Sequence, residues 1–249
     1  RVRTDLDNTS RDHRLRAHFP LPARVTSSTA ECAFGVVERG LTVEGGPHEQ
    51  PLPTFVSRRF VDASDGNVGL ALLHDGLLEY ELVDGRELAL TLLRATGYLS
   101  RSQIAMRPNP AGPLDPLEGP QLQRRIAFDY ALVPHVGTWR DADLYASADA
   151  FLVPLERARA AGDGARPSTG RALAVEGAEV SAVLREPGGL VVRVFNPSSD
   201  AAVTRVEHDG APARGWRVDL RGRPVDRFEG EVSLRGCEIA TLRVDEPPS

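Results

Sequence analysis

Alternation of apolar and polar residues with a period of two is the feature that most restricts the folds open to this chain. At its start, Val2, Thr4 and Leu6 fall on one side of an extended backbone, and charged residues fall on the other. The segment "HRLRAHF", which begins at His13, alternates in the same way. Such alternation is typical of strands that bury one face and leave the other in water. The sequence therefore predicts an all-β fold.

Turn signals separate the alternating segments. In "LLEYELVDGRELALTLLR", Asp84-Gly85 supplies the positive φ of a tight turn, which predicts a hairpin. Asp65-Gly66 and Asp75-Gly76 mark two earlier turns. The further predicted strands are Glu31–Glu38, Ile126–Val133, Gly189–Phe195, Ala202–Glu207, Trp216–Leu220, Glu231–Leu234 and Glu238–Val244.

One helix, one long loop and one linker are predicted among the strands. Residues 141–161 are rich in alanine and other helix formers, although Pro154 must break or kink a helix there. Residues 105–122 hold five prolines and are either an ordered functional loop or a flexible one. The segment "AGDGARPSTG", residues 161–170, reads as a linker. We therefore expect one domain over 1–160 and a small β-sandwich over 171–249.

Composition excludes several classes of protein. The chain has 249 residues, of which 41% are hydrophobic, so a core can form. A net charge of −5 argues against nucleic-acid binding, and no stretch of 18 apolar residues exists to span a membrane. With no apolar leader and no initiator Met, we expect the chain to begin inside a longer protein. Cys32 and Cys237 are expected to be buried free thiols, which favours a cytoplasmic location.

No catalytic motif is present. The sequence lacks the glycine-rich phosphate loops, the HExxH and CxxC metal patterns and the GxSxG elbow. Its many Asp and Glu residues form no pattern that singles out a pair for sugar hydrolysis. We therefore assign no catalytic residue and no metal ligand to this chain.

The segment "RDHRLR" is the first candidate for binding. In a strand, Asp12, Arg14 and Arg16 share one face, and His13 begins the apolar face. A solvated cationic face with a packed histidine explains this pattern. Alternatively, Asp12, His13 and Arg14 contact sugar hydroxyls or brace another domain, for which the planar guanidinium of arginine is suited.

Three other positions carry similar alternatives. Glu79 and Glu81 flank Tyr80, which is either a packed tyrosine beneath a solvated face or part of a carboxylate–aromatic surface for carbohydrate. Arg101 is either a surface charge or a group that reaches an acidic partner. His135, at the end of a predicted strand, is interpreted as structural.

Several segments in order resemble a known family. They are "NTSRDHRLRAHFP", "HEQPLPTFVSRRFVDASDGNVGLALLHDGLLEYEL", "LALTLLRATGYLSR", "FDYALVPHVGTW" and the final "LVVRVFNPSS…VDLRG…EIATLRV". Their order resembles the C-terminal β-domain of bacterial α-mannosidases of glycoside hydrolase family 38. The resemblance implies a large antiparallel sandwich of the galactose-mutarotase-like kind, followed by a smaller sandwich.

The resemblance also carries functional expectations. In the family, a zinc ion, a nucleophilic Asp and most sugar contacts belong to an N-terminal α/β domain and the helical segment after it, and nothing here resembles those motifs. The resemblance implies that this chain holds no cofactor, and that zinc belongs to the catalytic domain of the parent enzyme. The family's reaction is retaining hydrolysis through a covalent glycosyl–enzyme intermediate.

Two functions follow as hypotheses. In the first, the chain is the inactive C-terminal region of an α-mannosidase, packs on its own N-terminal catalytic domain and helps to shape the cleft for an α-mannoside. Asp12, His13, Arg14, Glu79, Tyr80 and Arg101 are then its substrate-binding or domain-docking residues. In the second, it is a stand-alone carbohydrate-binding module, although an aromatic content of 6% weighs against that function. A purely structural sandwich in an assembly is a third possibility.

Overall fold

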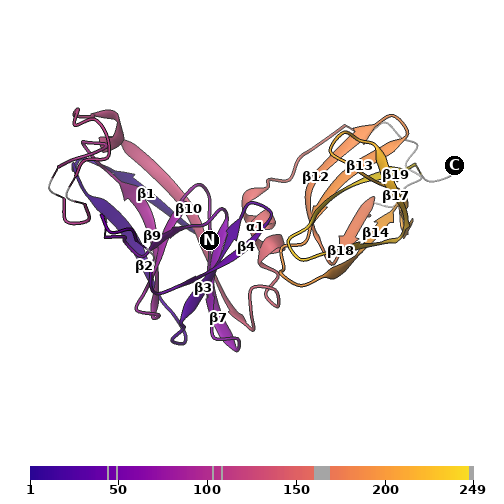
Figure 1. Ribbon diagram of the computed structural model, residues 1–249, viewed down its shortest axis with the longest axis horizontal. Coiled ribbons are helices and arrows are strands. Elements are labelled where there is room, and N and C mark those ends of the chain that lie inside the picture. The colour runs from indigo at the N-terminus through magenta and orange to yellow at the C-terminus, as the bar shows by residue number, and fades with distance from the viewer. Residues whose placement is uncertain (44, 49, 103, 108, 160–168, 247–249) are drawn as a thin grey trace. The chain divides into compact units, whose positions relative to one another are not determined.

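The computed structural model describes residues 1–43, 45–48, 50–102, 104–107, 109–159 and 169–246. The chain divides into two compact units (Figure 1). Unit 1 comprises Arg1–Cys32 and Val37–Pro154, and unit 2 comprises Ala33–Val36 and Leu155–Ser249. Most of the linker predicted over 161–170 lies outside the described residues, so that boundary stays a prediction.

Unit 1 contains two sheets. The first sheet has the order β1 (Val2–Asp7), β10 (Arg125–Val136), β7 (Val68–His74), β6 (Phe60–Ser64), β3 (Ser27–Cys32) and β4 (Gly35–Gly40). The second sheet has the order β2 (Arg14–Pro20), β9 (Glu87–Arg94), β8 (Glu79–Val83) and β5 (Thr54–Val56). Leu72 and Tyr130 from the first sheet pack in one core with Leu88 and Leu90 from the second. The two sheets thus form an antiparallel sandwich, as predicted.

The predicted alternation is present in the strands that suggested it. In β1, Val2, Thr4 and Leu6 are partly buried while the residues between them are exposed. In β2, Leu15, Ala17 and Phe19 pack against the core. The hydrophobic effect therefore fixes which face of each strand points inward.

Two short turns decide the course of the chain in unit 1. Asp84 and Gly85 have φ values of 51° and 68° and connect β8 to β9, which confirms the predicted hairpin. The single strand predicted over Glu31–Glu38 is wrong. The chain reverses after Cys32 through Phe34, whose φ is 61°, and so forms two strands, β3 and β4.

The helix α1 (Leu144–Leu152) is shorter than predicted. Asp143 precedes it and accepts a hydrogen bond from the backbone N–H of Ala146, which satisfies one of the free donors of the first turn. The helix ends before Pro154, which cannot continue it. The Tyr145 ring packs edge-on against Phe60 of β6, with 5.3 Å between ring centroids. The helix therefore covers the outer face of the first sheet.

Unit 2 is also built from strands. Their order is β11 (Leu173–Glu176), β14 (Ala202–His208), β18 (Glu231–Leu234), β17 (Pro224–Glu229), β16 (Arg214–Val218), β19 (Ile239–Asp245), β13 (Gly189–Phe195) and β12 (Glu179–Glu186), and β15 (Ala211–Pro212) pairs with β14. One core gathers Val194 and Leu242 from β13 and β19 with Val206 and Leu234 from β14 and β18. The sheet thus folds over its own core.

Both cysteines were predicted to be buried, and neither of them is. Cys32, at the end of β3, is partly exposed, and Cys237 lies exposed in the turn before β19, with a φ of 55°. Both are free thiols.

Candidate functional site

The outer face of the second sheet brings together two segments that the sequence marked separately. Strand β9 lies between β2 and β8, and Arg14 of β2 reaches across it to Glu79 of β8 at 2.7 Å. Thr91 of β9 lies beneath this pair, accepts a hydrogen bond from the Arg14 guanidinium at 2.9 Å and donates one to Glu79 at 2.7 Å. Arg14 and Glu79 therefore satisfy each other and leave little unpaired charge.

The pairing extends along the sheet. Arg16 pairs with Glu81, His18 lies 3.0 Å from Glu87, and Arg94 lies 3.3 Å from Glu79. We call this set the ion-pair face; its members are Arg14, Arg16, His18, Glu79, Glu81, Glu87 and Arg94. The acidic residues of β8 and β9 largely neutralise the cationic residues of β2. The ion-pair face consequently offers no strong field to attract an anionic partner.

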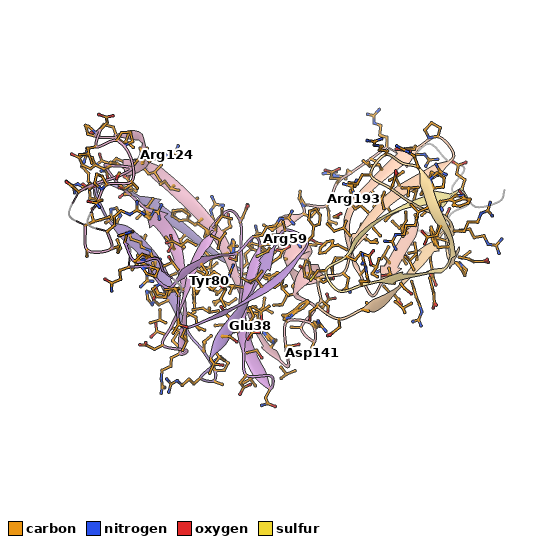
Figure 2. The ribbon with its side chains drawn as sticks, viewed as in Figure 1. Glu38, Arg59, Tyr80, Arg124, Asp141 and Arg193 are labelled. Carbon is orange, nitrogen blue, oxygen red and sulfur yellow. The ribbon has the colours of Figure 1, made fainter. Side chains whose placement is uncertain are left out.

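Tyr80 does not belong to this face. Its side chain points into the interior of unit 1, where it is fully buried (Figure 2). The Tyr80 hydroxyl lies 3.0 Å from Ser28 Oγ, and burial raises the pKa of the phenol. The carboxylate–aromatic surface suggested by "EYE" is therefore not formed, because successive residues of a strand point to opposite faces.

Asp12 and His13 lie outside β2, at a junction between loops. Asp12 Oδ1 accepts hydrogen bonds from the Gly97 N–H at 2.8 Å and from Gln121 Nε2 at 2.9 Å, and the Asp12 N–H donates to Gln121 Oε1. The hydrogen bonds from Gln121 and then Gly97 lower the pKa of Asp12. The backbone carbonyl of His13 accepts from the N–H of Ala95 at 2.8 Å. These contacts connect the loops, and they leave Asp12 out of the strand face expected for it.

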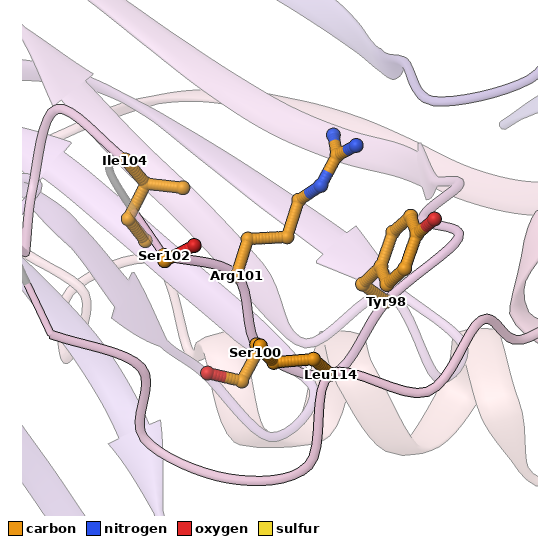
Figure 3. Close-up of a pocket in the computed structure, with 6 residues that line it drawn as sticks. All are labelled: Tyr98, Ser100, Arg101, Ser102, Ile104 and Leu114. Carbon is orange, nitrogen blue, oxygen red and sulfur yellow. The ribbon is translucent and has the colours of Figure 1, made fainter.

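Arg101 lies apart from the ion-pair face, in the connection between β9 and β10. Its guanidinium stacks over the Tyr98 ring, 4.4 Å from the centroid. A pocket of about 410 Å³ opens beside it and is lined by Tyr98, Ser100, Arg101, Ser102, Ile104 and Leu114 (Figure 3). Sequence reasoning named Arg101 but gave no sign of the pocket, because Leu114 is brought back to Arg101 only by the folding of the loop.

The connection that forms this pocket contains hydrogen bonds of its own. The N–H of Leu117 donates to the Gly97 carbonyl at 2.7 Å, and the N–H of Ala111 donates to Ser100 Oγ at 2.6 Å. The choice between an ordered and a flexible segment over 105–122 stays a prediction. The large exposed apolar side chains among the described residues of this connection are those of Leu99, Met106 and Leu114, with exposed fractions of 76%, 37% and 52%. We call these three residues the apolar loop surface.

Three buried polar pairs in unit 1 are structural. His135 Nε2 lies 2.7 Å from Asp62 Oδ1, and burial raises the pKa of that carboxyl. Glu31 is fully buried and pairs with Arg59 at 2.7 Å. His74 is fully buried and hydrogen-bonds Ser57 at 2.7 Å. Buried charges and donors need such partners, and enclosed groups of this kind cannot reach a substrate.

Neither a metal centre nor a membrane-spanning helix is found in the described part of the chain. Within those ranges, no three His, Cys, Asp or Glu side chains lie close enough together to hold a metal ion. No helix among the described residues has the length and apolar character required to cross a membrane.

The chain is similar to known proteins in sequence. Residues 1–110 match the family described as "Glycosyl hydrolases family 38 C-terminal domain". A putative mannosylglycerate hydrolase of Halalkalibacterium halodurans is 26% identical over 254 residues, which cover 98% of this chain and 27% of the relative.

Two solved structures from Enterococcus faecalis are similar along almost the whole chain. One is of a protein in glycosyl hydrolase family 38, with a TM-score of 0.75, and the other is of an α-mannosidase, with a TM-score of 0.77. Each is 26% identical, and each match covers 97% of this chain and 27% of the solved one. The chain thus spans only about a quarter of the length of these relatives.

Proposed function

We propose that this chain is the non-catalytic C-terminal part of a retaining α-mannosidase, because residues 1–110 match the glycosyl hydrolase family 38 C-terminal domain and the two solved structures are similar along 97% of the chain. One observation carries the proposal. The chain is matched almost from end to end, yet the match covers only 27% of each relative. In this proposal the remaining part supplies the catalytic domain, and this chain packs on that domain and helps to shape its cleft.

The next question is which part of the complete protein carries the catalytic groups. Retaining hydrolysis requires a carboxylate nucleophile and a second carboxyl group that acts as acid and then base. In unit 1, the buried carboxylates of Glu31 and Asp62 are enclosed and paired, so they serve the fold. Following the family resemblance, we place the nucleophile, the acid/base group and the zinc ion in the N-terminal domain of the complete protein.

We propose that docking uses the apolar loop surface. Leu99 and Leu114 expose 76% and 52% of their surface on this loop. Burying one leucine side chain contributes about 1.5 to 3 kcal/mol, which makes such residues effective contacts with another domain. The ion-pair face is less suited to docking, because its charges already neutralise one another.

A stand-alone carbohydrate-binding module is the less favoured function. Such a module needs an aromatic ring at the surface to cover the apolar face of a sugar. Tyr80, the ring proposed for that purpose from the sequence, is fully buried.

An activity assay tests the proposed function. The 249-residue chain and the complete protein are each incubated with 4-nitrophenyl α-mannoside and zinc. We expect hydrolysis by the complete protein and none by this chain alone. Turnover by this chain above the rate without enzyme, or no turnover by the complete protein, contradicts the proposal.

A further inference from the structure

The first sheet of unit 1 ends in a strand with an open edge. Strand β1 pairs with β10 along all six of its residues, and the register has no break. Among the residues that the structure describes, no strand lies on the other side of β1. A row of backbone groups is therefore left without a strand partner, and proteins commonly protect such an edge against pairing.

The unpaired backbone groups belong to every second residue of β1. The N–H of Asn8, directly after β1, donates to the carbonyl of Arg124, directly before β10. N–H groups alternate in direction along a strand, so those of Thr4 and Leu6 also face β10, and we call them the inward amides. The N–H groups that point away from β10, which we call the outward amides, are those of Arg3, Asp5 and Asp7.

Strand β2, at the edge of the second sheet, carries protection that β1 lacks. It has a bulge between Leu15 and Arg16, and it ends at Pro20, which has no N–H to donate. Bulges and prolines both hinder the pairing of a further strand. Strand β1 has neither, and its charged side chains are paired within the sheet, since Arg3 lies 3.1 Å from Asp129 of β10. The edge of β1 is therefore competent to pair.

The core of unit 1 is open beside the same edge. Leu6 of β1 lies opposite Ile126 of β10, and both pack against the core but are only partly buried. Leu72 of β7, the third strand of this sheet, is fully buried. A pocket of about 480 Å³ lies along β1 and is lined by Asp5, Leu6, Asp7, Arg125, Ile126 and Ala127. Apolar side chains of an added strand would remove Leu6 and Ile126 from water, which is favourable.

We propose that an extended segment from the N-terminal part of the complete protein pairs with the edge of β1 and adds a strand to the first sheet. This inference rests on the proposed function, in which the match to only 27% of each relative leaves a long preceding part of the chain. Because that part is joined to this chain, its effective concentration near β1 is high. Backbone hydrogen bonds hold the segment, and its alternate apolar side chains lie over Leu6 and Ile126.

Hydrogen exchange resolved to single amides tests this pairing. In the 249-residue chain by itself, the inward amides should exchange slowly and the outward amides rapidly. In the complete protein, the outward amides should exchange about a hundredfold more slowly, because they donate to the added strand. The inward amides are the internal control that β1 is folded in both samples.

Two results of this experiment overturn the inference. The first is rapid exchange of the outward amides in the complete protein. The second is slow exchange of the outward amides in the 249-residue chain alone, increasing with protein concentration. That result would show that a second copy of this chain, and not the N-terminal part, occupies the edge.

A proline at position 5 removes one outward donor and provides a second test. In the complete protein, Asp5→Pro should raise the exchange rates of the other outward amides by about tenfold or more. Asp5→Ala keeps the N–H and is the matched control, so it should leave those rates unchanged. The inward amides should stay protected in both variants. Equal effects of the two substitutions contradict pairing through the backbone, and if Asp5→Pro does not fold, the wild-type comparison still decides.

The activity of the same complete protein separates the two proposals. If it hydrolyses 4-nitrophenyl α-mannoside while its outward amides exchange rapidly, the proposed function stands and the added strand is wrong. If it hydrolyses no mannoside while its outward amides are protected, the proposed function fails and the added strand stands.

Discussion

The fold strongly alters the ionisation of His74. It lies at the end of β7 with no exposed surface, and its Nε2 hydrogen-bonds Ser57. Its Nδ1 is buried and has no partner among the described residues. Burial penalises the charged form and lowers the pKa of His74 from 6.5 to about 4. The histidine is therefore neutral at physiological pH.

Acid should destabilise the fold through this group. The pKa of His74 is lower in the folded than in the unfolded chain. Unfolding is therefore favoured as the pH falls from about 6.5 to about 4, by about 3 kcal/mol in all. His74→Gln cannot take up a proton, so it should lose less stability over this interval than the wild type. Urea unfolding of both proteins at neutral pH and at about pH 4.5 measures the difference. Equal losses in the two proteins contradict the account.

Sequence reasoning could name charged residues but could not pair them. The alternation in "RDHRLR" and "EYE" correctly placed Arg14 and Glu79 on outward faces. Their pairing depends on β9 lying between β2 and β8. The periodicity of a strand does not predict the order of the strands in the sheet. His74 gave no signal at all, because Ser57 reaches it only in the folded chain.

At the scale of elements, the hairpin between β8 and β9 depends on a glycine. Gly85 has a φ of 68°, and a Cβ built on it would lie 2.1 Å from the Val25 carbonyl oxygen. The Gly85 carbonyl in turn accepts the Val25 N–H at 2.9 Å. The turn is therefore held against a neighbouring segment of backbone that leaves no room for a side chain.

Gly85→Ala should consequently cost about 3 kcal/mol or more in the free energy of unfolding, because backbone has to move in addition to the strain of a positive φ. Gly76→Ala is a matched control. Gly76 has a φ of 71°, but a Cβ added there would meet nothing within 4 Å, so the substitution should cost only about 1 kcal/mol. Denaturant unfolding of both variants measures the two losses in the free energy of unfolding. Similar costs at the two positions contradict a steric role for Val25.

The sequence predicted strands that bury one face. It did not predict strands that are exposed on both faces. Strands β13, β18 and β19 were found from their apolar content. Strand β12 is exposed at most positions and β17 at all but one, so their sequences lack the contrast on which the predictions relied. The β3–β4 hairpin was predicted as a single strand because its turn, Ala33-Phe34, contains no glycine or other turn signal.

At the scale of the whole molecule, we propose that the apolar loop surface docks on a partner domain. Leu99→Asp combined with Leu114→Asp should weaken association with the separately produced N-terminal part by about a hundredfold or more, since the docked state would bury charge. Leu220→Asp is the control, because Leu220 is 97% exposed and lies in unit 2. Sedimentation velocity measures the association. Equal effects of the loop pair and Leu220→Asp contradict docking through the loop.

Reconstitution of activity from two parts tests the central claim most directly. The N-terminal part of the complete protein is titrated with this 249-residue chain, and hydrolysis of 4-nitrophenyl α-mannoside is followed in the presence of zinc. The account predicts negligible turnover by either part alone and a rate that rises to saturation at one chain per catalytic part. Full activity of the N-terminal part without this chain, or turnover by this chain alone, would contradict it.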